Sequence, residues 1–581
     1  MSSASQQQGG LDSALGRYQL YTLGSTIVIV ICAIIFCRSK HKEPTVPLLP
    51  NEHVGHLAGL QRDALEDPSL EAKKWRCNIC GFRNATDQLE CALCRSSQAL
   101  YLLVTPEFAT ADGTVVALDN LNSTQRSARE RHDWMREYNS TTGVLWKANH
   151  TDPSTLNHYI VSCTKDENTL KWLAFDATFA GVHIGSGEST QSWWYGQLEY
   201  VRSLSFSLKF AWLVNQLTTL DSTHTKMKVY RNKIFEESIQ LLVILKVDQL
   251  CSKTKITLLG ESAIDAGGVT REWYTLLTDE IFSADQGLFF VSNVEDQSFF
   301  IQPNSATLNG PNHLNHFLAV GRLLGRAIID GQVLPFHFCV PLFKMLLGYP
   351  VSMDDIRYLD PTVYSSLVYV RDCDDVDDLA LTFSVTVDEA GSEVELVVGG
   401  RDIAVTNANK AEYVDRMVQY LLFDRVAPQL QHLVQGLYDV LPQELLMPFD
   451  YKELELMLCG FSEIDVADWK RSTIVSKSLE DVVGWFWDVI EFDMTASERA
   501  KLLQFTTGSS RVPLQGFKAL TSNDGRLCPF NLYGIPYTRG SFPRVHSCFN
   551  RIDLPIYPTR ELLREGLFVL VTMDTAEFTI A

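Results

Sequence analysis

The chain has 581 residues, about four domains' worth at about 150 residues per domain, and 46% of them are hydrophobic, 10% aromatic and 21% charged. This composition is typical of a globular protein, and it excludes a wholly disordered, collagen-like or coiled-coil chain. Its 70 acidic residues outnumber its 50 Lys and Arg residues, and a net charge of -20 argues against nucleic acid as the main partner.

Residues 20–37 form a long apolar run of 18 residues without a charge. As a helix this run is about 27 Å long, enough for a thin bilayer. A cleaved signal peptide and a buried core helix are the alternatives, but the first lacks a basic start and the second lacks a surrounding domain. Arg38, Lys40 and Lys42 follow directly, so the positive charge places the C-terminal side in the cytosol. We therefore expect an N-terminal tail (residues 1–19), a single membrane-spanning helix (residues 20–37) and a linker (residues 38–70), in a membrane that the sequence does not identify.

Two Cys-x-x-Cys pairs follow the linker, with ten residues between them. Four thiolates at this spacing form a closed tetrahedral site, which favours a structural zinc ion over a redox pair. Trp75 before the first pair and Asn84 after it complete a pattern that resembles the Ran-binding-protein type zinc finger. The finger is expected over residues 71–98, with the ligands Cys77, Cys80, Cys91 and Cys94.

Some fingers of that type bind ubiquitin through a Thr-Phe pair and an apolar residue before the fourth cysteine. Phe82 and Leu93 match two of these positions, whereas Gly81 stands where Thr is expected. The resemblance implies a ubiquitin contact through Phe82 and Leu93. Contact with another protein and a purely structural role are the alternatives.

Residues 101–205 have no recognisable motif, and the sequence assigns them no function. Their tryptophans, in strand-like stretches, are more often core residues than a peptide-binding face. The basic segment 126–131 is expected to be the solvated face of a helix. The tryptophans are Trp134, Trp146, Trp172, Trp193 and Trp194.

Seven cysteines remain after the four zinc ligands and the two in the apolar run are set aside. A nucleophilic thiol needs exposure and positive neighbours that lower its pKa. Six of the seven lie in apolar or acidic stretches or lack such neighbours. Cys548 is the best-placed nucleophile, with a packing role as the alternative, because Arg544, His546 and Arg551 all lie within four residues of it.

The segment from His546 to Arg551 resembles the active-site loop of HECT-type ubiquitin ligases, with Ser547 in place of the usual Thr. Further matches follow in family order, and the resemblance covers about residues 206–581. The matching segments are residues 265–272, 321–327, 399–403 and 503–508. In two of them glycines also predict structure directly: a turn at Gly267-Gly268 before a helix beginning near Thr270, and close helix packing at Gly321 and Gly325.

The resemblance implies an α+β fold with a bilobal catalytic domain. A mostly helical N-lobe (residues 206–470) would be joined by a hinge (residues 471–478) to an α/β C-lobe (residues 479–581). A ubiquitin-conjugating enzyme would dock within residues 367–437, and the implied contacts are Leu379, Leu381 and Tyr413.

The implied reaction is the transfer of ubiquitin from the conjugating enzyme to Cys548 as a thioester and then to a substrate lysine, with no cofactor for the transfer. His546 and Phe578 are the implied supporting residues. The carboxylates that could take the lysine proton are Asp553, Asp574, Glu577 and the chain terminus, which the sequence does not rank.

We therefore expect a membrane-anchored ubiquitin ligase that works on the cytosolic face with a conjugating enzyme, ubiquitin and unidentified substrates. A catalytically weak ubiquitin-binding scaffold is one alternative. A cysteine-dependent ubiquitin hydrolase, which would need a paired His and an orienting Asn or Asp, is the other.

Overall fold

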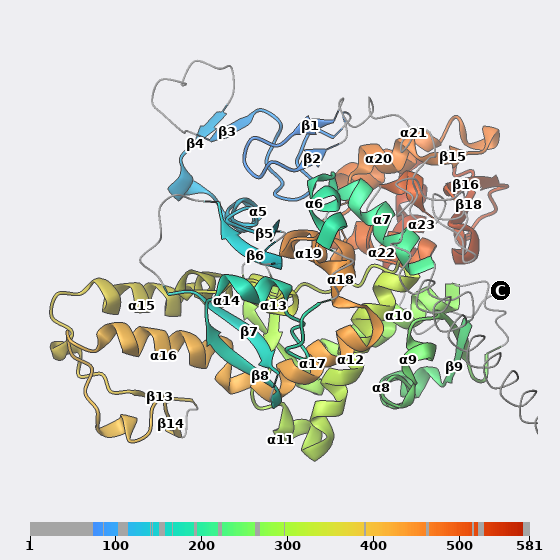
Figure 1. The fold of residues 1–581 in the computed structure, drawn as a ribbon. Helices are drawn as coiled ribbons and strands as arrows, with labels where there is room; N and C mark the ends of the chain where they lie inside the picture. Colours follow the sequence, from blue (N-terminus) through green and yellow to red (C-terminus); the bar gives the residue numbers. More distant parts are fainter. Residues whose placement is uncertain are drawn as a thin grey trace, which may run out of the picture. The chain divides into compact units, whose positions relative to one another are not determined.

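In a computed structural model of the chain (Figure 1), a small segment that carries the four paired cysteines, here called the finger, and a middle region precede a helical N-lobe and a C-lobe. No helix in the part of the chain that the structure describes is long and apolar enough to cross a bilayer. The predicted span, residues 20–37, lies outside that part. The described residues are 74–84, 86, 88–102, 114–139, 141, 143–149, 157–165, 167–190, 195–218, 224–261, 268–294, 297–387, 391–460, 464–513, 516–520 and 528–572.

Short antiparallel strands build the finger segment, in which β1 (Trp75–Arg76) pairs with β2 (Arg83–Asn84). The Trp75 indole donates a hydrogen bond to the carbonyl of Gln88 at 2.8 Å, which fixes the loop between the two cysteine pairs. Beyond the finger, β3 (Leu100–Leu102) runs parallel to β4 (Thr114–Val116). Too few apolar residues are present for a core of the usual kind, so this segment needs another source of stability.

In the described part of the middle region, one helix and two antiparallel hairpins are followed by a second helix that leads into the N-lobe. It forms a continuous structure with the N-lobe, because Tyr159 and Val351 exchange two backbone hydrogen bonds of 2.8 Å. The side chain of Gln443 also bonds the backbone of Val182 and Ile184, at 2.8 and 2.6 Å. The elements are α5 (Ser123–Glu130), β5 (Trp134–Asn139), β6 (Gly143–Ala148), β7 (Tyr159–Thr164), β8 (Glu167–Ala174) and α6 (Tyr195–Ser203).

Arg131 of the middle region makes a buried ion pair with Asp450, at 2.5 Å. Asp450 caps the N-terminus of α19 (Tyr451–Cys459) and accepts hydrogen bonds from the backbone of Lys452 and Glu453. Burial opposes the charge on Asp450, but the positive charges of Arg131 and Lys209 outweigh it and hold its pKa below the usual range. One end of an N-lobe helix therefore depends on a residue of the middle region.

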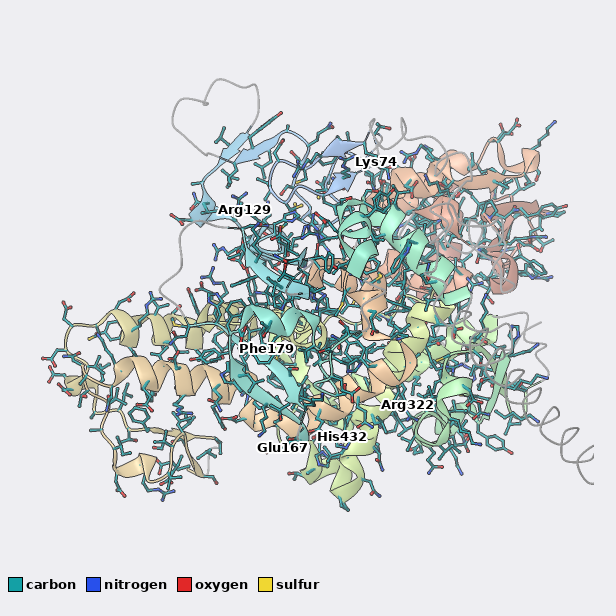
Figure 2. The ribbon with its side chains drawn as sticks, in the orientation of Figure 1. Lys74, Arg129, Glu167, Phe179, Arg322 and His432 are labelled. Carbon is teal, nitrogen blue, oxygen red and sulfur yellow. The ribbon has the colours of Figure 1, made fainter. Side chains whose placement is uncertain are left out.

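The expectation of a solvated basic face over residues 126–131 is wrong. Besides the buried Arg131, the Arg126 side chain donates to the carbonyl of Leu121 at 3.1 Å, and Arg129, labelled in Figure 2, donates to the carbonyl of Ile79 in the finger at 3.4 Å. Helix α5 thus packs between the finger and the N-lobe. Arg129 and the C-cap residue Arg131 bind partners far away in the sequence, whereas Arg126 binds a residue just before the helix.

The described tryptophans of the middle region all pack against other aromatic rings, in agreement with the predicted core role, but only Trp146 is buried, whereas Trp134 and Trp172 are half-buried. Trp146 is 3% exposed and lies 4.4 Å, ring centre to ring centre, from Tyr349 of the N-lobe. Trp172 stacks on Tyr159 at 4.8 Å. Trp193 and Trp194 lie outside the described residues.

The N-lobe is mostly helical, and its helices α12 (His313–Asp330) and α17 (Ala427–Val440) lie side by side. A Cβ on Gly321 would lie 2.1 Å from the carbonyl oxygen of Leu433, and one on Gly436 would lie 2.2 Å from that of Leu318. The two glycines therefore let the backbones touch, which confirms the packing predicted at Gly321.

Arg322 joins this helix pair to a third helix (Figure 2). It donates to Asp439 of α17 at 2.7 Å and to the carbonyls of Leu242 and Val243 at 2.8 Å, at the end of α8. The predicted start of a helix near Thr270 is also confirmed, because α10 begins at Gly268. The remaining N-lobe elements are α7 (Phe206–Thr218), β9 (His224–Val229), α8 (Ile234–Ile244), α9 (Val247–Leu250), β10 (Lys253–Leu258), α10 (Gly268–Ile281), β11 (Phe289–Asn293), β12 (Ser298–Ile301), α11 (Ser305–Asn309), α13 (Val340–Leu347), α14 (Ile356–Leu359), α15 (Pro361–Asp372), β13 (Ser384–Thr386), β14 (Glu393–Glu395), α16 (Lys410–Leu422), α18 (Gln443–Leu446) and α19 (Tyr451–Cys459).

The C-lobe, residues 464–572, has its own core around a four-stranded sheet of order β15-β16-β18-β17. Strands β15, β16 and β18 are parallel and β17 is antiparallel to β18. Mixed helix and strand content was predicted and is confirmed. The elements are α20 (Val466–Arg471), β15 (Thr473–Val475), α21 (Val483–Asp488), α22 (Ala496–Thr507), β16 (Phe530–Ile535), β17 (Arg544–His546), β18 (Arg551–Pro555) and α23 (Arg560–Thr572).

The structure corrects the predicted hinge at residues 471–478. Thr473 to Val475 pair with Phe530 to Leu532 inside the C-lobe sheet. Trp469, just before them, is fully buried in the C-lobe core, where its ring stacks on Phe517 at 4.9 Å. The polar composition that suggested a hinge is that of an edge strand, and the C-lobe begins near Val466.

Candidate active site and zinc site

The Cys548 segment is a tight turn between two paired strands of the C-lobe. His546, the last residue of β17, faces Arg551, the first residue of β18, and the 3-10 turn Ser547–Phe549 joins them. The structure describes the backbone of Cys548 in the middle of this turn, and its side chain lies outside the description. Phe549 beside it is 63% exposed. The turn therefore stands at the surface, at the end of a strand pair in which β18 contributes Ile552 and Leu554 to the core.

Asp553 links the strand residues on either side of the turn. One of its carboxylate oxygens lies 3.0 Å from His546 Nε2 and the other lies 2.5 Å from Arg551 Nε. The Arg551 guanidinium also lies over the Tyr533 ring, 4.5 Å from its centre. The predicted supporting residue His546 is thus held by a carboxylate that the sequence named but could not rank.

Asn550 is a structural residue of this site that the sequence analysis missed. It has a left-handed backbone with φ of 46° and is fully buried. The side-chain NH2 group of Asn550 donates a hydrogen bond to the backbone carbonyl of Cys528 at 2.7 Å. The backbone carbonyl of Asn550 accepts one from the backbone N–H of Asn531 at 2.8 Å. Asn tolerates this conformation better than most residues, and an Asn directly after a turn was the available signal.

Two motifs of the family resemblance meet between the lobes. Arg271 donates to the carbonyl of Thr507 at 2.8 Å, and Thr275 donates to that of Gly508 at 3.2 Å. The C-lobe end of α22 is therefore bound to α10 of the N-lobe. Phe578, the other predicted supporting residue, lies outside the described residues.

The four cysteines predicted to bind zinc come together in the finger. All four are buried, and their Sγ atoms lie within 4.8 Å of one another. The pairs Cys77–Cys94 and Cys80–Cys91 are 3.5 Å apart, sulfur to sulfur. This sulfur–sulfur distance is too long for a disulfide bond, which measures about 2.05 Å. It is close to the ~3.8 Å that separates two sulfurs bound to one metal in a tetrahedron with metal–sulfur bonds of about 2.3 Å.

Local backbone geometry explains how the cysteines converge. After each pair the backbone turns through a left-handed residue, Gly81 with φ of 71° and Arg95 with φ of 59°. Asn84 joins the two turns, because its side chain accepts from the Ala92 backbone at 2.9 Å and donates to the Phe82 carbonyl at 3.2 Å. This geometry fits zinc held by four sulfurs, with no position left for water or substrate.

A cation between the four sulfurs would allow all four to be bound as thiolates. Hydrogen bonding with Cys80 lowers the pKa of Cys77, and the same contact raises the pKa of Cys80. Four thiolates at this separation repel one another strongly unless a positive ion lies between them.

The predicted ubiquitin-binding residues of the finger are buried. Phe82 is 8% exposed and lies 6.1 Å from the Phe206 ring of α7, and Leu93 is 7% exposed. The contact stays a prediction, and it would require the finger to leave α7.

The predicted docking residues for a conjugating enzyme lie in a segment that contains α15, α16 and the hairpin of β13 and β14. Tyr413 of α16 is buried, 5.5 Å from the Phe383 ring, so it supports this segment from inside. Leu379 and Leu381 are half-buried. Val398, which the sequence analysis missed, is fully exposed and Ile403 is 40% exposed.

The sequence matches the HECT-domain (ubiquitin-transferase) family over residues 275–581, which include the Cys548 turn. It is 39% identical to "E3 ubiquitin-protein ligase TOM1" of Saccharomyces cerevisiae over 359 residues, 61% of this chain and 11% of that protein. It is 38% identical to "E3 ubiquitin-protein ligase Smurf1" of Drosophila melanogaster over 390 residues, 66% of this chain and 36% of that protein. The chain thus spans about a tenth and about a third of the lengths of these two relatives.

Proposed function

The chain belongs to the HECT-domain (ubiquitin-transferase) family, and from this membership we propose that it is a ubiquitin-protein ligase with Cys548 as the acceptor of ubiquitin. The observation that carries the proposal is the surface turn of β17, Ser547–Phe549 and β18, within the matched residues. Two relatives named as E3 ubiquitin-protein ligases support it.

In the first step the Cys548 thiolate attacks the thioester carbonyl of a ubiquitin-charged conjugating enzyme. A new carbon–sulfur bond forms, and the conjugating enzyme leaves as its own thiolate. The two thioesters have nearly equal energies, so the protein contributes mainly position. The exposed apolar side chains of Val398 and Ile403, in the same segment as the half-buried Leu379 and Leu381, support docking of the conjugating enzyme there.

In the second step the amine of a substrate lysine attacks the thioester on Cys548, and Cys548 leaves as the thiolate. Lysine has a pKa of about 10.4, so its proton must be removed or held during attack. Asp553 is the candidate acceptor among the described residues, because it lies on the strand that follows the Cys548 turn and already orients His546 at 3.0 Å.

The pairing of His546 with Asp553 also favours a second candidate, a thiol hydrolase that releases ubiquitin to water. A ubiquitin C-terminal coumarin amide distinguishes the two. A hydrolase releases coumarin from it without a conjugating enzyme, whereas the proposed ligase does not and instead forms lysine conjugates when charged conjugating enzyme is supplied. Coumarin release that depends on Cys548, without conjugate formation, would overturn the ligase proposal.

The zinc ion is proposed to be structural, and the transfer needs no cofactor. We also propose that residues 20–37 anchor the protein, with the HECT domain on the cytosolic side; the apolar run and the basic residues after it support this. Extraction of cell membranes at high pH tests the anchor. Release of the full-length chain into the supernatant would contradict it.

A further inference from the structure

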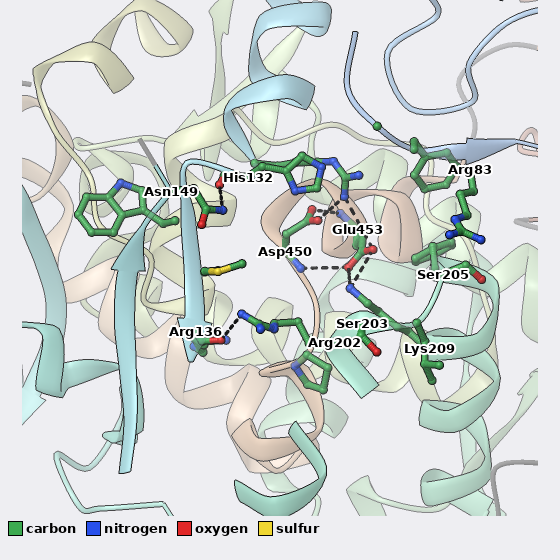
Figure 3. Close-up of a pocket in the computed structure, with 18 of the residues that line it drawn as sticks. Arg83, His132, Arg136, Asn149, Arg202, Ser203, Ser205, Lys209, Asp450 and Glu453 are labelled. Carbon is green, nitrogen blue, oxygen red and sulfur yellow. Dashed lines mark hydrogen bonds and ion pairs between the residues drawn. The ribbon is translucent and has the colours of Figure 1, made fainter. Parts of the chain in front are cut away.

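A cavity of about 370 Å³ opens where the finger, the middle region and the N-lobe meet (Figure 3). It is lined by β1 and β2, by the connection between α6 and α7 and by the start of α19. Nothing in the proposed transfer uses it. Its charged lining consists of Arg76, Arg83, Arg131, Arg136, Arg202 and Lys209 together with Asp450 and Glu453.

The two carboxylates in this lining are already neutralised. Asp450 lies 2.5 Å from Arg131, and Glu453 lies 2.9 Å from the Lys209 ammonium (Figure 3). The four other arginines make no ion pair with any carboxylate of the residues that the structure describes. The cavity therefore holds a cluster of uncompensated positive charge in a protein whose net charge is -20.

Arg136 is the most unusual of the four, because it is only 5% exposed. Its guanidinium donates to the carbonyls of Met447, at 3.0 Å, and Leu347, and lies 4.6 Å from the centre of the Trp146 ring. Its Nε has no hydrogen-bond partner among the described residues, and burial lowers its pKa. Carbonyl dipoles and a ring face compensate a buried charge only in part, so an anion beside it would be strongly favoured.

The neighbouring arginines come from two other parts of the chain. Arg202 at the end of α6 is half-buried and reaches toward Arg136, whose carbonyl it contacts at 2.5 Å (Figure 3). Arg76 and Arg83 are exposed side chains of the finger. Gly81 leaves room for the first of them, because a Cβ there would lie 3.2 Å from Arg76 Nη2.

We propose that this cavity binds a compact polyphosphate anion through Arg76 and Arg83 of the finger and Arg136 and Arg202 of the middle region. Guanidinium groups bind phosphate oxygens with paired hydrogen bonds, and several around one cavity match an anion with several phosphates. A bound anion would join the finger to the middle region and the N-lobe. The site is separate from the Cys548 turn, so anion binding can be tested independently of the proposed ligase activity.

Titration calorimetry of the zinc-loaded full-length chain with inorganic tripolyphosphate and with myo-inositol hexakisphosphate tests the proposal. At about 150 mM salt, which screens weak surface binding, we expect saturable binding of one anion per chain and a higher unfolding temperature. Arg76→Gln combined with Arg83→Gln should weaken binding at least about tenfold. These exposed positions keep the test valid even if the buried Arg136→Gln variant fails to fold.

The matched control is Lys226→Gln combined with Lys228→Gln, which removes the same charge from the exposed face of β9. It should bind as the wild type does. Failure of both anions to bind saturably, or equal loss of affinity in the control and the finger variant, would overturn the proposal.

The same chemistry is present in a free anion and in a phosphorylated lipid head group. Vesicles of phosphatidylcholine, with and without a bisphosphorylated phosphatidylinositol, separate the two sources. If the phosphorylated vesicles displace bound tripolyphosphate and the plain vesicles do not, the ligand of the cavity is a lipid head group. If tripolyphosphate stays bound with both kinds of vesicle, the ligand is a soluble anion.

Discussion

Asp553 is the residue on which the geometry around Cys548 depends most directly, since its carboxylate holds both His546 and Arg551. Asp553→Asn keeps the shape and removes the charge. We expect thioester formation on Cys548 to continue, while discharge of ubiquitin to lysine slows roughly tenfold or more, because the lysine proton loses its acceptor. The measurement is single-turnover discharge of the preformed thioester to free lysine.

The pH dependence of that discharge separates proton transfer from a loss of structure. From about pH 7 to about pH 9 lysine increasingly loses its own proton, so the defect of Asp553→Asn should shrink. Asp493→Asn is the control, because Asp493 also holds two arginines of the C-lobe, Arg560 and Arg564, outside the turn. Equal defects in both variants, or a defect unchanged by pH, would mean that Asp553 is only structural.

Val398 tests the proposed docking surface for the conjugating enzyme. Its side chain is fully exposed, and Val394 and Ile403 of the same segment are 37% and 40% exposed. Val398→Asp should slow thioester formation about tenfold through weaker docking, with discharge unchanged. Val247→Asp on α9, at a residue 56% exposed, is the matched control. The surface is wrong if both variants accept ubiquitin at the wild-type rate.

At the scale of elements, the contact of α12 with α17 leaves no space for a side chain at Gly321. Gly321→Ala should destabilise the protein by about 3 kcal/mol, because the clash is with backbone and cannot be relieved by a rotamer change. Gly484→Ala is the control, since a Cβ there meets nothing within 4 Å and the helix α21 should gain slightly. Urea unfolding of the two variants measures the difference, and equal stabilities would contradict the packing.

The finger should depend on its metal. Removal of zinc by a chelator is expected to unfold residues 74–98. The segment has too small an apolar core to fold alone, so the bonds from the four buried cysteines to the metal would supply most of its stability. Hydrogen exchange measures this by segment. We expect protection to fall in the finger and in α5, whose Arg129 binds the Ile79 carbonyl, while the C-lobe sheet keeps its protection. A finger that stays protected without zinc would contradict a structural metal site.

Local motifs explain what could be predicted at this scale. Four cysteines in two pairs and the residues around Cys548 specify their own turns, so the convergence of the four cysteines and the tight turn at Cys548 were accessible from sequence. Contacts between residues far apart in the chain could not be predicted from the sequence. The burial of Arg131 depends on Asp450, 319 residues away, and the strand pairing of Thr473 to Val475 depends on β16. Nothing in either segment indicated these contacts.

At the scale of the whole molecule, the middle region is an integral part of the structure around the N-lobe. Its backbone pairing at Val351 and its ion pair with Asp450, the N-cap of α19, join it to the N-lobe. The sequence offered no function for residues 101–205, because most of its contacts are made by ordinary core and ion-pair residues. The basic cavity beside it arises only in three dimensions, from arginines of the finger and of the middle region.

The central claim is that Cys548 carries ubiquitin as a thioester. The most direct measurement incubates the full-length chain with activating enzyme, charged conjugating enzyme and ubiquitin, followed by a non-reducing gel. We predict an adduct on the wild type that reductant removes, no adduct on Cys548→Ala, and a reductant-stable ester on Cys548→Ser. An adduct of the same yield on Cys548→Ala, or no adduct on the wild type with any conjugating enzyme tried, would contradict the account.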